Sequence, residues 1–154
     1  MDRYAENEQY LSMAKSVFSM QIDALKKVSD RMDGAFVEAV ELILSCQGRV
    51  VILGVGKSGL IGHKIASTLS STGTASLNVH ASDALHGDLG MISEEDAVLA
   101  ISYTGESKEL RDMINYCKRV SIPLIGMTGF AESALGGQSD TLLKFAPLQE
   151  ACPN

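Results

Sequence analysis

The sequence has few cysteines, no long apolar run and no excess of positive charge. Its three cysteines, Cys46, Cys117 and Cys152, lack the spacing of a zinc site or of a redox pair, so we expect reduced thiols. No apolar run approaches the roughly 20 residues that cross a bilayer. The formal net charge of −6 argues against a nucleic-acid surface. We therefore expect neither a membrane nor a nucleic-acid partner.

The sequence also lacks an internal repeat and a low-complexity linker. Its first residues, Met1 to Glu8, are polar and acidic, so no apolar leader is expected. These absences predict a cytoplasmic protein. With 154 residues, we expect one domain over 1–154, made of N-terminal helices at 1–47 and a sheet-containing core at 48–154. A chain of this size buries about 68–70% of its unfolded surface and needs no disulfide or metal to fold.

Hydrophobic periodicity predicts the order of helices and strands. Two helices come first, and Gly48 is expected just after the second. The first helix is long and amphipathic, and its apolar side is expected to pack either on another subunit or on its own core. The two N-terminal helices are predicted at 5–29 and 35–47, and the strands at 50–53, 75–79, 97–102, 122–127 and 141–145. Further helices are predicted from Leu60 to about Ser70, from Ser107 to about Val120 and at 132–136. A loop is predicted at 80–90, with one helical turn at 82–85.

This alternation predicts an α/β fold of three layers, α/β/α, with five parallel strands in the flavodoxin-like order 2-1-3-4-5. Ligands of such sheets bind at the carboxyl ends of the strands, where the strand order reverses. Here that point lies between the first and third strands. The segments that follow these two strands are the candidate site: the glycine turn, Gly54 to Gly59, and the hydroxyl loop, Ser102 to Ser107.

Three interpretations of the glycine turn compete. Its glycines match a dinucleotide-binding fingerprint, but the second strand ends at His80 without the acidic residue that the motif requires. A Walker loop would need glycine at position 51, which is Val51. The turn could also be a tight connection without a ligand. A strand, a glycine turn and a helix N-terminus together favour an anion, most often a phosphate.

The hydroxyl loop carries Ser102, Thr104 and Ser107, which are suitable donors for a phosphate. Ser58 in the glycine turn adds another hydroxyl, and Lys57 adds a positive charge at the tip of that turn. The alternative is that Thr104 merely caps the following helix, with Glu106 in its first turn. Capping explains one hydroxyl well and three poorly, so phosphate binding is favoured.

Other candidates carry weaker signals. His80 and His86 flank a loop, and their spacing matches no metal motif, although loop position favours a functional role. Glu109 lies in the helix after the hydroxyl loop, and the pattern does not favour it over Glu106. Glu150 lies in a tail that the pattern leaves unassigned.

At these residues the chain resembles the SIS (sugar isomerase) domain of D-arabinose-5-phosphate isomerases. The resemblance covers nearly the whole chain, and HGDLGMI and EACP are its more specific segments. It rests on GVGKSGLIGHKIASTLSSTGT, VHASDALHGDLGMI, AISYTGESKEL, PLIGMTG and EACP.

The resemblance implies a homotetrameric isomerase that interconverts D-ribulose 5-phosphate and D-arabinose 5-phosphate, on the route to Kdo of lipopolysaccharide or capsule. It implies no required cofactor, and zinc at His80 as an inhibitor. Gly73 and Thr74 correspond to a substrate-contacting turn. Phosphate-loop positions correspond to Ser58, Ser102, Thr104 and Ser107, and catalytic positions to Lys57, His86, Glu109 and Glu150.

The implied chemistry suits these residue types. Isomerisation through an enediolate needs a base, a donor for the developing oxyanion and a fixed phosphate. Glu109 or Glu150 could be the base, and Lys57 or His86 could polarise the oxygen. Two alternatives remain: a non-catalytic module that senses a sugar phosphate or a nucleotide sugar, and an isomerase of hexulose or heptose phosphates.

The sequence departs from the family pattern in one respect. The family continues past EACP with a Ser/Thr-rich loop, an amphipathic helix and a further histidine, and many members add CBS domains, whereas this sequence ends at Asn154. Without that helix we expect exposed apolar surface and an obligate homo-oligomer, a dimer or a tetramer, and the activity of this chain alone is open.

Overall fold

The computed structural model describes residues 3–80, 88–145 and 150–151, and it divides the chain into two compact units. One unit comprises Met1–Met32 and Ala146–Asn154 and contains helix α1, Arg3–Ser29. The long N-terminal helix is therefore confirmed. A lone helix cannot bury its own apolar side, so the partner of that side stays a prediction, as does the single domain over 1–154.

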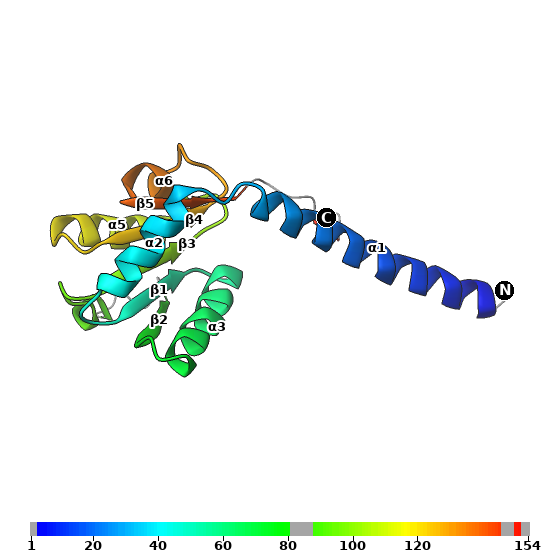
Figure 1. The fold of residues 1–154 in the computed structure, drawn as a ribbon, viewed down its shortest axis with the longest axis horizontal. Coiled ribbons are helices and arrows are strands. Elements are labelled where there is room, and N and C mark those ends of the chain that lie inside the picture. Colours follow the sequence, from blue (N-terminus) through cyan, green and yellow to red (C-terminus); the bar gives the residue numbers. More distant parts are fainter. Residues whose placement is uncertain (1–2, 81–87, 146–149, 152–154) are drawn as a thin grey trace. The chain divides into compact units, whose positions relative to one another are not determined.

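The other unit, Asp33–Phe145, is called the sheet unit here. Its five strands are parallel and lie in the order β2-β1-β3-β4-β5, which confirms the predicted α/β fold (Figure 1). The elements are α2 (Gly34–Ser45), β1 (Val50–Gly54), α3 (Lys57–Ser71), β2 (Ser76–His80), the 3₁₀ helix η1 (Asp88–Met91), β3 (Ala97–Ile101), α5 (Lys108–Arg119), β4 (Leu124–Thr128), α6 (Ala134–Gln138) and β5 (Thr141–Lys144).

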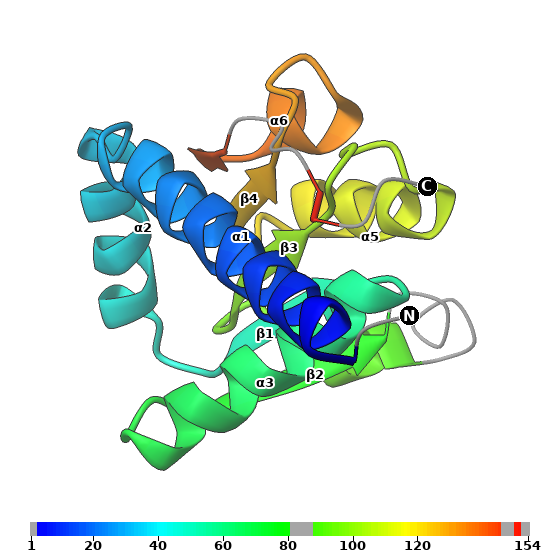
Figure 2. The same ribbon diagram turned by 90° about the vertical axis from the view of Figure 1, so that its right-hand side faces the viewer.

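Side chains that alternate along the central strands form a core on each face of the sheet. Val50 and Ile52 pack with the face that α2 and α3 cover, whereas Val51 and Leu53 pack with α5 and α6. Figure 2 shows these two helix pairs on opposite sides of the sheet. Every residue of β1 and β3 is buried, as expected for strands covered on both faces. The three predicted layers are confirmed.

Several predicted boundaries are wrong for identifiable reasons. Helix α3 begins at Lys57 rather than at Leu60. Gly56 has a φ of 55°, so the chain reverses direction at this single residue and the helix can begin directly after it. Helix α2 is capped by Cys46, so Gly48 is not the residue after the helix. The amide N–H of Gly48 donates to the carbonyl oxygen of Glu95 at 2.8 Å, and a Cβ on Gly48 would lie 2.9 Å from that oxygen. Gly48 is thus needed for a close approach of two loops.

The loop predicted at 80–90 differs in part. Its first residue, His80, is the last residue of β2, and its last residues belong to η1. The predicted helical turn at 82–85 lies outside the described residues. Within the described part of the chain, no helix is both long and apolar enough to cross a membrane.

At the amino-terminal edge of the sheet, Asp96 joins the start of β1 to the segment before β3. Only 2% of Asp96 is exposed. Its carboxylate accepts the backbone N–H of Arg49 at 2.7 Å and that of Ser93 at 2.8 Å, and the Arg49 guanidinium lies 3.6 Å away. Burial alone would raise the pKa of Asp96, but the backbone N–H groups of Ser93 and Arg49, together with the guanidinium, hold it below the usual value.

We expect Asp96→Ala to lower the free energy of unfolding by about 1–3 kcal/mol at pH 7, because two partly buried N–H groups lose their charged acceptor. A lowered folded-state pKa means that the carboxylate stabilises the fold above its unfolded-state pKa and loses this effect as the pH falls through the folded-state pKa. Urea unfolding at pH 7 and at successively lower pH should therefore show that the difference in free energy of unfolding between variant and wild type becomes smaller as the pH falls. Asp112→Ala, on the exposed side of α5, is the control. A difference that is absent at pH 7, or independent of pH, would contradict this role.

Candidate functional site

The register of the sheet brings the two candidate segments to neighbouring positions at its carboxyl edge. Gly54, the last residue of β1, pairs with His80 of β2 on one side and with Ile101 of β3 on the other. The glycine turn leaves β1 and the hydroxyl loop leaves β3 at this level. Two polar segments therefore emerge side by side where the strand order reverses, the usual ligand position of such sheets.

The glycine turn is tight because its backbone packs against itself. A Cβ on Gly54 would lie 2.7 Å from the carbonyl group of Ser58 and from the amide nitrogen of Gly59. The turn closes with the N–H of Ser58 donating to the carbonyl oxygen of Val55 at 3.1 Å. Ser58 is therefore in the first turn of α3, half-buried.

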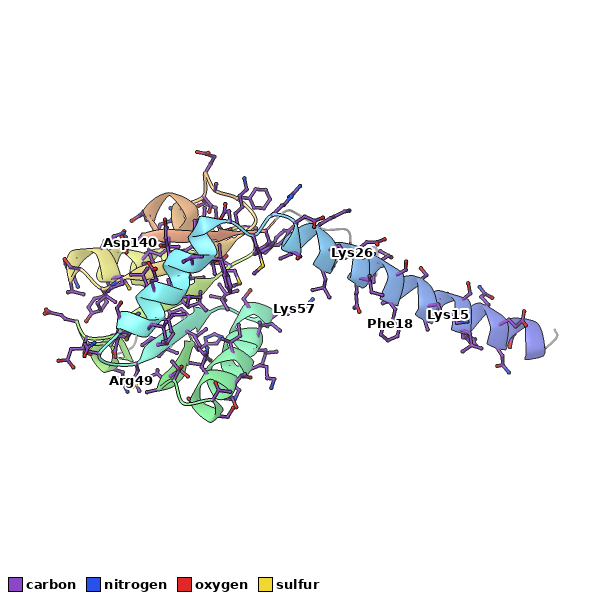
Figure 3. All side chains as sticks on the ribbon, in the orientation of Figure 1. Lys15, Phe18, Lys26, Arg49, Lys57 and Asp140 are labelled. Carbon is purple, nitrogen blue, oxygen red and sulfur yellow. The ribbon has the colours of Figure 1, made fainter. Side chains whose placement is uncertain are left out.

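Lys57 is the first residue of α3 and is exposed, so it does not stand at a loop tip as predicted. The early start of α3 after Gly56 is the reason. Figure 3 shows Lys57 and Arg49 at opposite ends of β1, which places Lys57 at the carboxyl edge of the sheet. Its charge is thus available beside the glycine turn.

The two helices that follow β1 and β3 lack side-chain caps. Gly56 precedes α3 and Ser107 precedes α5, and neither makes a capping hydrogen bond with its side chain. In contrast, Asp33 caps α2 by accepting the N–H of Ala35 at 3.0 Å, and Ser133 caps α6 by accepting that of Gly136 at 3.1 Å. The first-turn N–H groups of α3 and α5 are thus left without a side-chain acceptor in the described residues. Such groups, with the positive ends of two helix dipoles, favour an anion.

The hydroxyl loop is an ordered turn built on Ser102. Only 4% of this residue is exposed, and its hydroxyl oxygen accepts the N–H of Gly105 at 3.0 Å. Its oxygen lies 3.3 Å from the hydroxyl oxygen of Ser107, so these two predicted site residues meet. Thr104 is exposed, and its hydroxyl oxygen accepts the N–H of Glu106 at 3.3 Å.

These contacts decide one alternative that the sequence left open. Thr104 does not cap α5, because the N-cap residue is Ser107, and the acidic residue in the first turn is Glu109 rather than Glu106. The capping explanation of Thr104 is therefore wrong. The difference arises because the loop continues for three residues beyond Thr104 before the helix begins.

The structure describes one of the two predicted histidines, His80. His80 ends β2 and lies beside the glycine turn, because a Cβ on Gly59 would be 3.4 Å from its Cδ2 atom. His86 lies outside the described residues. No group of three His, Cys, Asp or Glu side chains suited to a metal ion occurs in the described part of the chain.

The remaining candidates lie in three different places. Glu109 is half-buried in the first turn of α5, next to the hydroxyl loop. Gly73 and Thr74 precede β2 and so lie at the opposite, amino-terminal edge of the sheet, where they line a cavity of about 210 Å³ with residues of α2 and β1. Glu150 is exposed and belongs to the unit that contains α1. A role for each of these residues stays a prediction.

The sequence analysis did not identify the residues that pack against the hydroxyl loop at Gly105. Gly105 has a φ of 70°, and a Cβ on it would overlap Ser133 and lie 3.0 Å from the hydroxyl oxygen of Thr128. The loop after β3 is therefore packed against the segment between β4 and α6. A glycine between hydroxyl residues was the available signal, but it does not reveal which distant segment fills the space.

Comparison with known proteins identifies the sequence family of this region. The model of the SIS domain family matches residues 43–151. Arabinose 5-phosphate isomerase KdsD of Pseudomonas aeruginosa is 43% identical over 149 residues, which are 97% of this chain and 46% of that protein. Arabinose 5-phosphate isomerase GutQ of Escherichia coli K12 is 43% identical over 147 residues, 96% of this chain and 46% of that protein. The chain thus spans about half the length of these curated relatives.

A solved structure with the same fold contains a bound ligand. The structure of E. coli CFT073 c3406 in complex with A5P superposes with a TM-score of 0.90 and 34% sequence identity. The match covers 99% of this chain and 79% of the other.

Proposed function

This chain belongs to the SIS domain family, and we propose that it carries the site of an aldose–ketose isomerase that interconverts D-arabinose 5-phosphate and D-ribulose 5-phosphate. The names of its relatives and the A5P complex of a structural neighbour support this substrate. The observation that carries the proposal is the pair of uncapped helix N-termini beside the hydroxyl loop, since a phosphate ester requires such a set of donors.

We assign the phosphate to the space between the glycine turn and the hydroxyl loop. Thr104 and Ser107 would donate their hydroxyl hydrogens, and Ser58 would contribute from the first turn of α3. Ser102 would keep the loop in shape, because its oxygen already accepts the N–H of Gly105. In this arrangement local dipoles hold the dianion, although the chain as a whole has a formal charge of −6.

We assign the proton transfer between C1 and C2 to Glu109. It is half-buried and follows the hydroxyl loop directly, so a sugar anchored by its phosphate would extend from that loop. Lys57 or His86 would polarise the substrate oxygen while the enediolate forms. Glu150, which the family resemblance also implies, is the competing base.

We propose that catalysis needs no cofactor, since a carboxylate and a polarising donor suffice for an enediolate mechanism. Zinc at His80 would act as an inhibitor. The setting we propose is the cytoplasm, on the route to Kdo of lipopolysaccharide or capsule.

We also propose a homo-oligomer, a dimer or a tetramer. Large apolar side chains remain exposed on α2 and α3 of the sheet unit, and a second copy would cover them. They are Phe36, Val37, Val40 and Leu44 of α2, and Leu60 and Ile61 of α3. Large exposed apolar side chains in this number commonly mark a protein interface.

The direct test follows conversion of ribulose 5-phosphate to arabinose 5-phosphate by the purified chain, with thermal unfolding measured in the presence of each sugar phosphate. We expect both turnover and stabilisation by the ligand. Stabilisation without turnover would favour a sugar-phosphate sensor, and turnover of a hexulose or heptose phosphate alone would assign a neighbouring isomerase activity. If the chain neither binds nor converts any of these compounds, the proposal is refuted.

A further inference from the structure

We propose that Glu106 is a positioning residue that holds the hydroxyl loop in its binding conformation by clamping it to α6, an inference that rests on the proposed function. Glu106 belongs to the hydroxyl loop itself, but it contributes no hydroxyl and is not among the residues assigned to substrate binding. Its carboxylate joins the loop to two other elements, α5 and α6, and each of its oxygens has a separate partner.

One oxygen of the carboxylate binds the backbone of α6. Oε1 of Glu106 accepts the N–H of Ala134, the first residue of α6, at 2.8 Å. The contact spans 28 residues of sequence, so it is a tertiary connection and not a local turn. A carboxylate that accepts a backbone N–H makes a charge-assisted hydrogen bond, which is stronger than a bond between neutral groups.

The other oxygen binds α5. Oε2 of Glu106 lies 2.7 Å from the guanidinium of Arg111, and the two side chains are 49% and 55% exposed. An ion pair this exposed contributes little stability by itself. Its main effect is to restrict the rotamer of Glu106, so that Oε1 stays aimed at Ala134. Because both oxygens are occupied, Glu106 is poorly placed to act as the base, which leaves Glu109 as the carboxylate of this segment.

Backbone contacts on the same side of the loop show what the clamp reinforces. The carbonyl oxygen of Tyr103 accepts the N–H of Gly129 and the hydroxyl of Thr128, both at 3.1 Å. The carbonyl oxygen of Gly105 accepts the N–H of Leu135 at 3.0 Å. These bonds hold the loop up to Gly105, and Glu106 is the last residue of the loop that is bonded to the segment around α6 before the uncapped N-terminus of α5. A loop released there would let the hydroxyl groups of Thr104 and Ser107 change position, and a phosphate would have to reorder them on binding.

The test compares Glu106→Ala, which removes both contacts, with Glu106→Gln, which keeps an oxygen for Ala134 but loses the charge. Arg111→Ala removes the ion pair alone. Glu132→Ala is the matched control, because Glu132 is an exposed glutamate between β4 and α6. For each variant, inorganic phosphate binding is measured by calorimetry, steady-state kinetics with ribulose 5-phosphate give KM and kcat, and hydrogen exchange is measured for peptides covering 103–110 and 130–136.

We expect Glu106→Ala to weaken phosphate binding and to raise KM about tenfold, with kcat changed less than about threefold. Glu106→Gln and Arg111→Ala should each stay within about threefold of wild type in KM, and Glu132→Ala should not differ. Exchange should accelerate in both peptides of Glu106→Ala and in neither peptide of Glu132→Ala. Wild-type affinity in Glu106→Ala overturns the inference. An equal loss of kcat in the Ala and Gln variants also overturns it, since that result assigns Glu106 to the chemistry.

The exchange measurement separates this inference from the proposed function because it needs no ligand. If wild type binds no phosphate but Glu106→Ala still accelerates exchange in both peptides, the clamp stands and the isomerase proposal fails. If wild type binds phosphate and converts the sugar while Glu106→Ala exchanges like wild type, the isomerase proposal stands and the clamp is refuted.

Discussion

Replacing Gly105 by alanine is expected to lower the free energy of unfolding by about 2–5 kcal/mol and to abolish detectable phosphate binding. Two costs add at this position. Gly105 has a φ of 70°, a backbone conformation that costs an L-residue about 1–2 kcal/mol. The new Cβ would also overlap Ser133 and lie 3.0 Å from the hydroxyl oxygen of Thr128, and overpacking of this kind costs about 1–3 kcal/mol.

The loss of binding is expected because relief of this overlap separates the hydroxyl loop from the segment between β4 and α6. Ser102 would lose the N–H of Gly105, and the contact between the hydroxyl groups of Ser102 and Ser107 would be disturbed. Urea unfolding gives the stability and calorimetry gives the affinity for inorganic phosphate.

A matched glycine provides the control for the Gly105 prediction. Gly137 of α6 has an ordinary φ and open space around the position of its Cβ, so Gly137→Ala should be neutral or slightly stabilising. Adding Ser133→Gly to Gly105→Ala removes the overlapping atoms of Ser133 and should restore most of the steric part of the lost stability, less the few tenths of a kcal/mol that the lost α6 cap costs, but not the part due to φ. If Gly105→Ala unfolds and binds phosphate like wild type, the packing of the hydroxyl loop described here is wrong.

Glu109→Gln is expected to lower kcat for the proposed isomerisation by about 10²–10⁴-fold and to change KM little. General-base catalysis contributes a factor of this size, and glutamine has nearly the same shape as glutamate but accepts no proton at neutral pH. Because the phosphate is held by other residues, ground-state binding should persist. Steady-state kinetics with ribulose 5-phosphate, together with phosphate affinity, separate the two effects.

The control for Glu109 is Asp112→Asn, which removes an exposed carboxylate from the same helix and should leave both kinetic constants unchanged. A Glu109→Gln variant that retains kcat within about threefold would exclude Glu109 as the base. Glu150→Gln would then be expected to show the large loss, because Glu150 is the second carboxylate that the family resemblance implies.

Most of the fold could be predicted because its signals are local. The runs in β1 and β3 are short and apolar throughout, and strand and helix patterns alternate along the chain, which together specify a parallel sheet. The strand order then placed the glycine turn and the hydroxyl loop at one edge. Errors occurred where one residue has an unusual backbone or a long-range contact. Gly56 starts α3 three residues early, and Gly48 accommodates Glu95 rather than ending α2.

The proximity of two hydroxyl groups in the candidate site was predictable, whereas its contacts with distant segments were not. Ser102 and Ser107 were expected together and lie 3.3 Å apart. That Glu106 reaches Ala134, 28 residues further along the chain, could not be predicted, because a solvated glutamate and a clamping glutamate look the same in sequence. Gly73 and Thr74 carry no local signal for a ligand, and only the family resemblance implies one.

The central claim is that a sugar phosphate binds with its phosphate between the glycine turn and the hydroxyl loop. A crystal structure of this protein with arabinose 5-phosphate tests it most directly. The account predicts phosphate oxygens within about 2.7–3.2 Å of the hydroxyl groups of Thr104 and Ser107 and of first-turn amides of α3 or α5. A phosphate bound at the opposite edge of the sheet, beside Gly73 and Thr74 alone, would contradict it.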